Sequence, residues 1–173
     1  MPLAKIILLT INIIGGIAVI GSYIWGAKIG PGGINALWGG TPEGIRPVYT
    51  VSMAIAALGY LAFIFYILFK LDPNSFNFNI LYLIFFLILG ASAFWMPLTN
   101  IFLVNPGTLL WLLIRIVLAV VGIVSCVLVW VLMSLVVKEN NLFYWLAVIG
   151  SFYFAFHTAV LDMILWPIFF KMQ

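Results

Sequence analysis

Long apolar runs alternate with short polar breaks along this chain. Five apolar stretches lie at about 5–25, 48–69, 80–103, 108–137 and 142–170. A helix needs roughly 20 apolar residues to cross the hydrocarbon core of a bilayer, whereas membrane β-barrels use alternating segments of about ten residues. The pattern therefore predicts an all-α polytopic membrane protein, a bundle of five transmembrane helices forming a single domain over residues 1–173.

The breaks between the runs differ in length. Those at 71–75, 104–107 and 138–141 are tight and carry the Asn, Asp, Pro or Gly residues that end helices. The break at 26–47 is long, rich in glycine, and contains three prolines and Trp38. A long loop in a compact bundle is more often functional than decorative. We expect this loop to cover the mouth of the bundle, and we call that side of the molecule the loop end.

Composition narrows the class of protein. The chain is 66% hydrophobic and 6% charged, whereas soluble proteins have about 25% charged residues. A soluble enzyme, a secreted disulfide scaffold and a disordered regulator are therefore excluded, and the bilayer is the expected partner. The net charge of +3 comes from scattered bases, so no nucleic-acid partner is predicted. A single cysteine, Cys126, excludes an internal disulfide and a thiolate metal site.

The basic residues do not fix the orientation in the membrane, because the two sides carry equal numbers of them and the positive-inside rule has nothing to act on. They are Lys5, Lys70 and Lys138 on one side, and Lys28, Arg46 and Lys171 at the loop end.

Two charged residues lie inside predicted spans. At 1.5 Å per residue, Arg115 is about 10 Å and Asp162 about 12 Å from the loop end. An ionised group there costs on the order of 3 kcal/mol. Their matching depth and opposite charge predict that both face the interior and pair, directly or through water or a ligand. A purely structural ion pair, or an Arg115 that reaches the headgroups, is the alternative.

Small and polar residues form one stripe along the fifth run, and such a stripe turns away from lipid. His157 stands about 140° around an α-helix from Asp162, so the two are not expected to form a proton-relay pair. The sequence indicates no catalytic residues: no serine or cysteine nucleophile stands near a plausible base, and no metal spacing is present. The stripe comprises Ser151, Ala155, Thr158, Asp162 and Trp166.

A kinked wall is predicted in the third run. Trp95 precedes Pro97 inside the span, where proline frees a backbone carbonyl and bends the helix. Thr99 and Asn100 follow at once. An aromatic, partly polar wall of this kind suits a planar apolar ligand.

Several short segments together resemble the TspO/MBR family of tryptophan-rich sensory or translocator proteins. Trp38 with Pro42 resembles the family's first-loop Trp-x-Pro-Pro region, and Pro47-Val48-Tyr49-Thr50 resembles the opening of its second helix. Phe94–Leu98 is similar to the third-helix motif, and Leu161-Asp162 with Trp166 is similar to the fifth-helix Leu-Asn-x-x-x-Trp. The family's Pro-Tyr-x-x-Trp signature is absent, and Asp162 stands where the family has Asn.

The resemblance implies a five-helix fold whose first loop closes over a pocket. It also implies a hydrophobic planar ligand, either a porphyrin or a sterol, and a homodimer. No cofactor is required, although a tetrapyrrole could bind, and the arginine would suit a porphyrin carboxylate. The predicted ligand-binding residues are Trp38, Pro42, Arg46, Tyr49, Trp95, Asn100, Arg115, Thr158, Asp162 and Trp166.

Two other functions stay open. The chain could be an accessory structural subunit of a larger membrane complex, because Gly15, Gly16 and Gly122 offer small surfaces for close helix contact. It could also be an enzyme or proton-coupled carrier that acts at Asp162 and His157, although only those two residues point to it.

Overall fold

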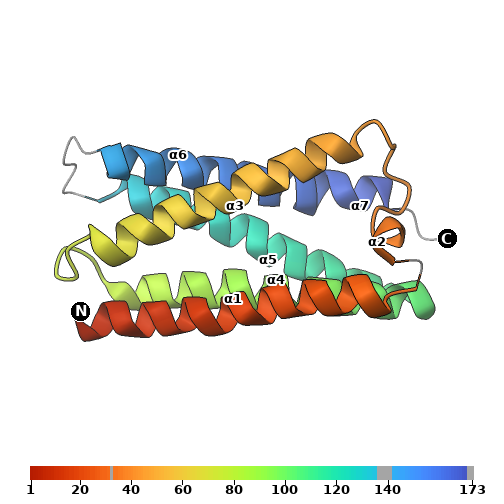
Figure 1. Ribbon diagram of the computed structural model, residues 1–173, viewed down its shortest axis with the longest axis horizontal. Helices are drawn as coiled ribbons and strands as arrows, with labels where there is room; N and C mark the ends of the chain where they lie inside the picture. The colour runs from red at the N-terminus through yellow and green to blue at the C-terminus, as the bar shows by residue number, and fades with distance from the viewer. Residues whose placement is uncertain (32, 136–141, 171–173) are drawn as a thin grey trace.

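The computed structural model describes residues 1–31, 33–135 and 142–170. These residues form helices and no strands. Four helices are continuous: α1 (Leu3–Ile29), α3 (Arg46–Phe69), α4 (Phe78–Val104) and α5 (Thr108–Met133). The fifth crossing consists of α6 (Leu142–Phe156), the π-helix η1 (His157–Leu165) and α7 (Trp166–Phe169), and α2 (Gly33–Ala36) is a single turn in the first connection (Figure 1). The predicted all-α, five-helix architecture is confirmed for the described residues.

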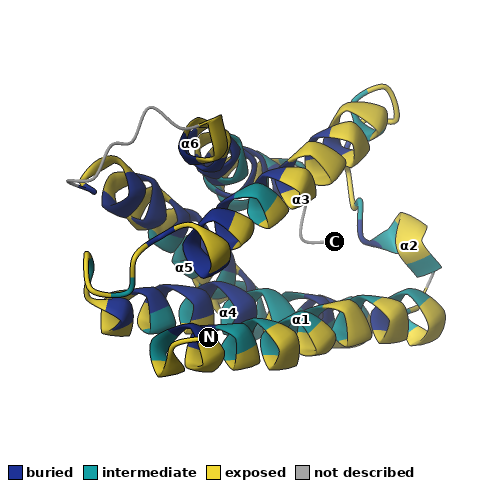
Figure 2. Ribbon diagram, turned by 60° about the vertical axis from the view of Figure 1, so that its left-hand side comes forward, coloured by how far each residue is buried: buried dark blue, intermediate teal, exposed yellow. Residues whose placement is uncertain are grey.

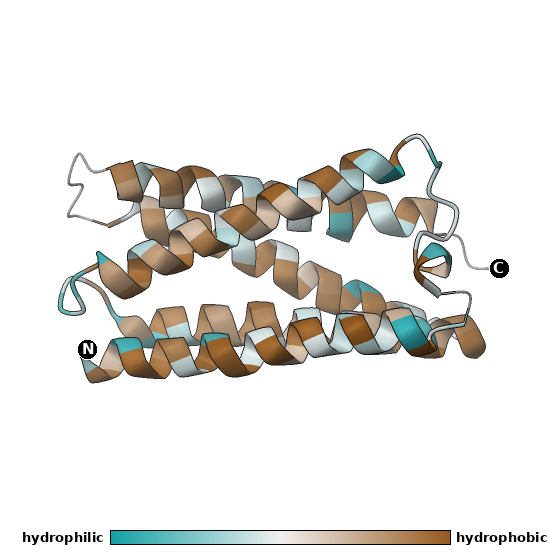
Figure 3. Cartoon of the chain, viewed as in Figure 1, coloured by the Kyte–Doolittle hydropathy of each residue, from teal (hydrophilic) through white to brown (hydrophobic). Residues whose placement is uncertain are grey.

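All five crossings are long and apolar enough to span a bilayer, so the protein is an integral multi-pass membrane protein. Most residues along the five crossings are hydrophobic, as the brown ribbon of Figure 3 shows. Ile17, Leu58 and Phe86 each expose more than 60% of their surface. A soluble protein rarely exposes so many large apolar side chains together, so these positions face lipid.

Local sequence signals set the helix starts. Pro47 lies in the first turn of α3, where its missing N–H costs nothing. At the start of α4, the Asn77 Oδ1 atom accepts a hydrogen bond of 3.0 Å from the backbone N–H of Asn79. The predicted boundary of the first helix is wrong by four residues, since α1 runs on to Ile29. The extra turn is stabilised by contact with α4, because Gly26 packs against Met96 and Asn100.

The helices pack in the order α1, α4, α5, α6–α7 and α3, and α1 and α3 approach each other least (Figures 1 and 2). Glycines permit a close crossing of α3 and α6. A Cβ atom at Gly59 of α3 would lie 2.5 Å from the carbonyl oxygen of Gly150 of α6. Buried side chains form a large apolar core in the half of the bundle away from the loop and a second, aromatic cluster at the loop end.

Candidate functional site

The loop end is closed by aromatic rings. Trp166 and Phe170 stack with ring centroids 4.4 Å apart, and Trp95 meets Trp166 edge-on at 5.6 Å. Trp111 stacks on Phe170 at 5.7 Å. We call the rings of Trp95, Trp111, Trp166 and Phe170 the ring cluster. The pocket predicted under the loop is therefore occupied by packed side chains.

The first loop is tied to the ring cluster. The Trp166 Nε1–H group donates a hydrogen bond of 3.0 Å to the backbone oxygen of Leu37. Trp38 packs edge-on against Tyr49 at 6.0 Å. Gly39 has a φ of +50° and lies against Phe170, so a side chain at this position would be both strained and obstructed. These few contacts hold the loop down on the bundle.

His157 and Asp162 lie together, contrary to the sequence prediction. The His157 Nε2 atom is 3.5 Å from the Asp162 Oδ2 atom. The prediction assumed α-helical spacing, but residues His157–Leu165 form a π-helix. A π-helix closes its hydrogen bonds between residues five apart, so residues i and i+5 share a face. Such segments occur frequently at functional sites.

A hydrogen-bonded chain continues from His157 into α3. The His157 Nδ1 atom is 2.9 Å from the Ser52 Oγ atom, and the Tyr153 hydroxyl donates to the same Ser52 oxygen at 3.1 Å. Ser52 is 3% exposed and His157 is 5% exposed. Because Ser52 accepts from Tyr153, its own proton is free to be donated to His157. The prediction that no serine stands near a plausible base is therefore wrong.

The Asp162 side chain is partly exposed. One third of its side-chain surface (33%) is exposed, against 7% for His157. The phenol groups of Tyr23 and Tyr49 lie close enough to interact with its charge. The Tyr49 hydroxyl donates a hydrogen bond of 3.1 Å to the backbone oxygen of Leu161. A carboxylate set among phenols, with part of its surface free, can accept a hydrogen bond from a bound molecule.

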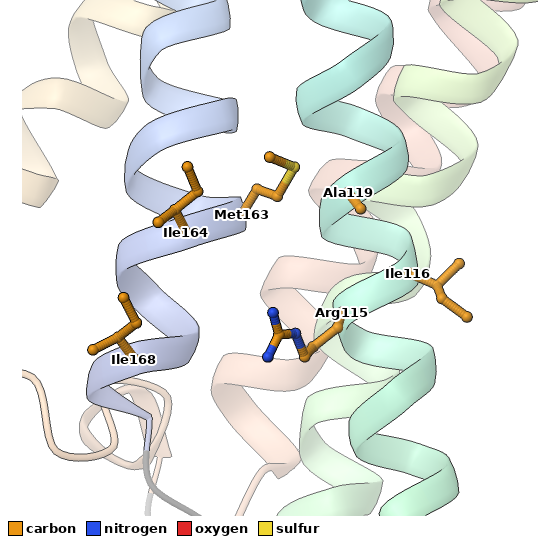
Figure 4. A pocket seen from close by; sticks show the side chains of 6 residues that line it. All are labelled: Arg115, Ile116, Ala119, Met163, Ile164 and Ile168. Atoms are coloured by element: carbon orange, nitrogen blue, oxygen red, sulfur yellow. The ribbon is translucent and has the colours of Figure 1, made fainter.

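The prediction that Arg115 faces the interior and pairs directly with Asp162 is wrong, and pairing through water or a ligand stays a prediction. Arg115 is exposed and lines a groove between α5 and the η1–α7 segment (Figure 4). The ion-pair contact that Asp162 makes within the described part of the chain is with His157. Depth alone placed the two residues at the same level, but it could not say on which side of each helix they lie.

The remaining predicted residues divide into two groups. Asn100 is buried against Gly26 and Gly30 of α1. Thr158 is also buried, and its hydroxyl bonds to the Phe154 oxygen of its own helix at 2.9 Å. Pro42 and Arg46 belong to the loop and its junction with α3: Pro42 is exposed, and the Arg46 Nε–H group donates to the Thr41 oxygen at 3.1 Å. These contacts do not by themselves assign ligand binding to any of these residues.

Three buried polar atoms have no hydrogen-bond partner among the described residues, and all three belong to the loop-end half of the molecule. They are Thr41 Oγ1, Trp95 Nε1 and Asn100 Nδ2. An unpaired buried polar group costs about 1–3 kcal/mol, so native proteins retain few of them. Because all three lie at the loop end, a bound molecule in this region could supply the missing hydrogen bonds.

Two grooves open on the outer face of the bundle. One, of about 410 Å³, is the groove that contains Arg115. The other, of about 380 Å³, lies between α3 and the fifth crossing, and Ser52 and Tyr153 are among the residues that line it. Sequence reasoning missed Ser52, Tyr153 and Tyr23, because an isolated hydroxyl in an apolar run carries no signal of its own.

Comparisons of this chain with protein-family models, with curated proteins and with solved structures gave no match. The resemblance to the TspO/MBR family therefore stays a prediction from short segments. The function has to be argued from the geometry of the loop end.

Proposed function

We propose that the protein binds a planar hydrophobic small molecule at the loop end, as a receptor or carrier of the TspO type. The observation that carries the proposal is the gathering there of the Asp162 carboxylate and three unpartnered buried polar atoms, beside the ring cluster. A ligand with a flat apolar body could stack on the rings, and its polar group could form hydrogen bonds with these unpaired groups. Because the rings pack closely under the loop, the ligand enters as the loop lifts.

The geometry favours one ligand class over another. Arg115, the arginine predicted to pair with a porphyrin carboxylate, faces the outer groove, so it is not placed to pair with a ligand at the ring cluster. Asp162 instead accepts hydrogen bonds from hydroxyl or N–H donors. We therefore propose a sterol-like ligand, with a flat apolar body and one hydroxyl group, ahead of a tetrapyrrole.

Equilibrium binding of a fluorescent sterol to the purified protein in nanodiscs tests this proposal. We expect Asp162→Asn to weaken binding about tenfold, because one hydrogen bond to a charged acceptor is lost. The same sterol with its hydroxyl methylated should bind weakly to both proteins and show no difference between them. Trp95→Phe, which removes the unpartnered N–H, should also weaken binding of a ligand that accepts from it.

Asp72→Asn is the matched control. Asp72 lies at the turn opposite the loop end, where its carboxylate accepts from the Asn74 N–H at 3.0 Å, so this change should leave sterol binding unaltered. Equal affinity of the parent and Asp162→Asn would contradict the proposal. Purification with stoichiometric partner proteins and no saturable sterol binding would favour the accessory-subunit function instead.

A second candidate function, acyl transfer, is favoured by the Ser52–His157–Asp162 chain. His157 can take the Ser52 proton while Asp162 holds the opposite ring nitrogen, and Ser52 lines a groove on the lipid side. The Ser52 oxygen would form a bond to the carbonyl carbon of a lipid ester, with His157 returning the proton to the departing alcohol. Water would then release the acyl group.

A fluorophosphonate probe distinguishes this second function. Labelling of Ser52 that disappears in Ser52→Ala and in His157→Gln would support it. Ser151→Ala is the control, because the Ser151 hydroxyl bonds only to its own helix, at the Val148 oxygen. An unlabelled Ser52 in the folded protein would remove acyl transfer from consideration.

A further inference from the structure

The groove that contains Arg115 combines one cation with apolar walls. Figure 4 shows the Arg115 side chain leaving α5 and pointing toward the η1–α7 segment. Every other residue that lines the groove is apolar, and the groove measures about 410 Å³. It lies on the loop-end side of the contact between α5 and η1 at which Gly122 packs against Ala159. The lining residues are Arg115, Ile116, Ala119, Met163, Ile164 and Ile168.

Arg115 has no protein anion to neutralise it within the described residues. The carboxylate of Asp162 contacts His157. No ion pair joins Arg115 to Glu43 or Asp72 among the described residues. An arginine keeps its charge at all physiological pH values. A charged group within a span is expensive unless it pairs or reaches the interface, so a negatively charged group at the mouth of this groove would stabilise Arg115.

The depth of Arg115 matches a lipid headgroup. It lies seven residues after Thr108, where α5 begins, which is about 10 Å of helix. Arginine side chains at this depth extend toward the interface and leave their aliphatic stems along apolar surface. The guanidinium group is planar and forms paired hydrogen bonds with phosphate oxygens. The apolar walls below it suit an acyl chain.

We propose that this groove is a binding site for one anionic phospholipid, with its phosphate on Arg115 and an acyl chain along Ala119, Met163 and Ile164. The charge of the groove selects a lipid with net negative charge over a zwitterionic one. The occupant is a membrane lipid and not a free phosphate ion, because a phosphate ion would leave the apolar walls of the groove uncovered. This site is separate from the loop-end ligand site and does not depend on it.

Native mass spectrometry of the protein with equal amounts of phosphatidylglycerol and phosphatidylcholine, matched in acyl chains, tests the proposal. The parent should retain phosphatidylglycerol about tenfold more than phosphatidylcholine, which corresponds to one charge-assisted contact. Arg115→Gln should reduce this ratio toward one, and Arg115→Lys should give an intermediate value because the paired geometry is lost. Lys28→Gln, which removes an exposed cation at the same end of the molecule, should leave the ratio unchanged.

Two further arms test the lipid itself. Ile168→Trp, a change at a lipid-facing wall position that is 63% exposed, should fill the groove and lower retention of phosphatidylglycerol while Arg115 is still present. Excess inorganic phosphate should not displace the lipid. The proposal is overturned if Arg115→Gln keeps the preference, if Ile168→Trp retains the lipid fully, or if phosphate alone competes it away.

Discussion

Ser52 joins three helical segments through one hydroxyl group. It lies on α3, contacts His157 of η1 at 2.9 Å and accepts from Tyr153 of α6 at 3.1 Å. A hydroxyl that both donates and accepts in an apolar bundle fixes the rotation of each helix around it. These two hydrogen bonds are therefore expected to contribute to stability.

We expect Ser52→Ala to lower the free energy of unfolding by about 1 kcal/mol, because His157 Nδ1 and the Tyr153 hydroxyl both lose their partner. Reversible unfolding in mixed SDS micelles measures this change. Thr50→Ala is the control: the Thr50 hydroxyl is exposed and bonds only to the Arg46 oxygen of its own helix. A loss for Thr50→Ala as large as for Ser52→Ala would show that the Ser52 contacts do not stabilise the fold.

Residue types along the chain predict which side chains turn away from lipid, but they do not predict which of these side chains pair with each other. The predictions that Trp166 and Thr158 turn away from lipid agree with their burial. Arg115 and Asp162 stand out in the sequence as charged residues inside spans, but matching depth and opposite charge do not suffice to predict that they pair. Depth along a helix follows from counting residues, whereas the direction of a side chain depends on the rotation of the helix, which tertiary packing decides.

At the level of elements, α3 and α6 cross with their backbones in close contact. Gly59 and Gly150 face each other there, and a Cβ atom at Gly59 would meet backbone and not a flexible side chain. Backbone cannot move aside without separating the helices, so this contact tolerates no side chain.

Gly59→Ala should destabilise the protein by about 1–3 kcal/mol through overpacking. Gly90→Ala is the matched control, because a Cβ atom at Gly90 of α4 meets nothing within 4 Å. That variant should be neutral or slightly stabilising, since alanine favours helix over glycine. SDS-induced unfolding of the two variants side by side decides the matter, and equal stabilities would contradict the packing described here.

The five crossings were predictable because their length and hydropathy each require a membrane helix. The π-helix at His157–Leu165 was not, since it has no distinctive composition; in the structure it packs against α5 and α3. That one element brings His157 to Asp162. A rare local geometry therefore determines the chemistry of the site.

At the scale of the whole molecule, one end is a rigid apolar core and the other is a loop held over aromatic rings. The bond from Trp166 Nε1 to the Leu37 oxygen is the hydrogen bond that ties the loop to the fifth crossing. A loop that is held by few contacts opens at a small cost in free energy. A low cost of opening would allow a ligand to enter under the loop.

Trp166→Phe should therefore speed amide hydrogen exchange in residues 34–41 by about fivefold, in proportion to one lost hydrogen bond of about 1 kcal/mol. Trp145→Phe, at a position on α6 that is 51% exposed, should leave that exchange unchanged. Identical loop exchange in the parent and Trp166→Phe would mean that this bond does not hold the loop.

Photoaffinity labelling with a diazirine-bearing sterol in nanodiscs, followed by peptide mapping, tests the central claim most directly. If the loop end binds the ligand, labelling in 33–49, 95–102 and 157–170 should be lost on competition with excess unmodified sterol. Labelling of lipid-facing positions such as Ile17 should resist competition. Labels found only on the lipid-facing surface, and unaffected by competitor, would contradict the account.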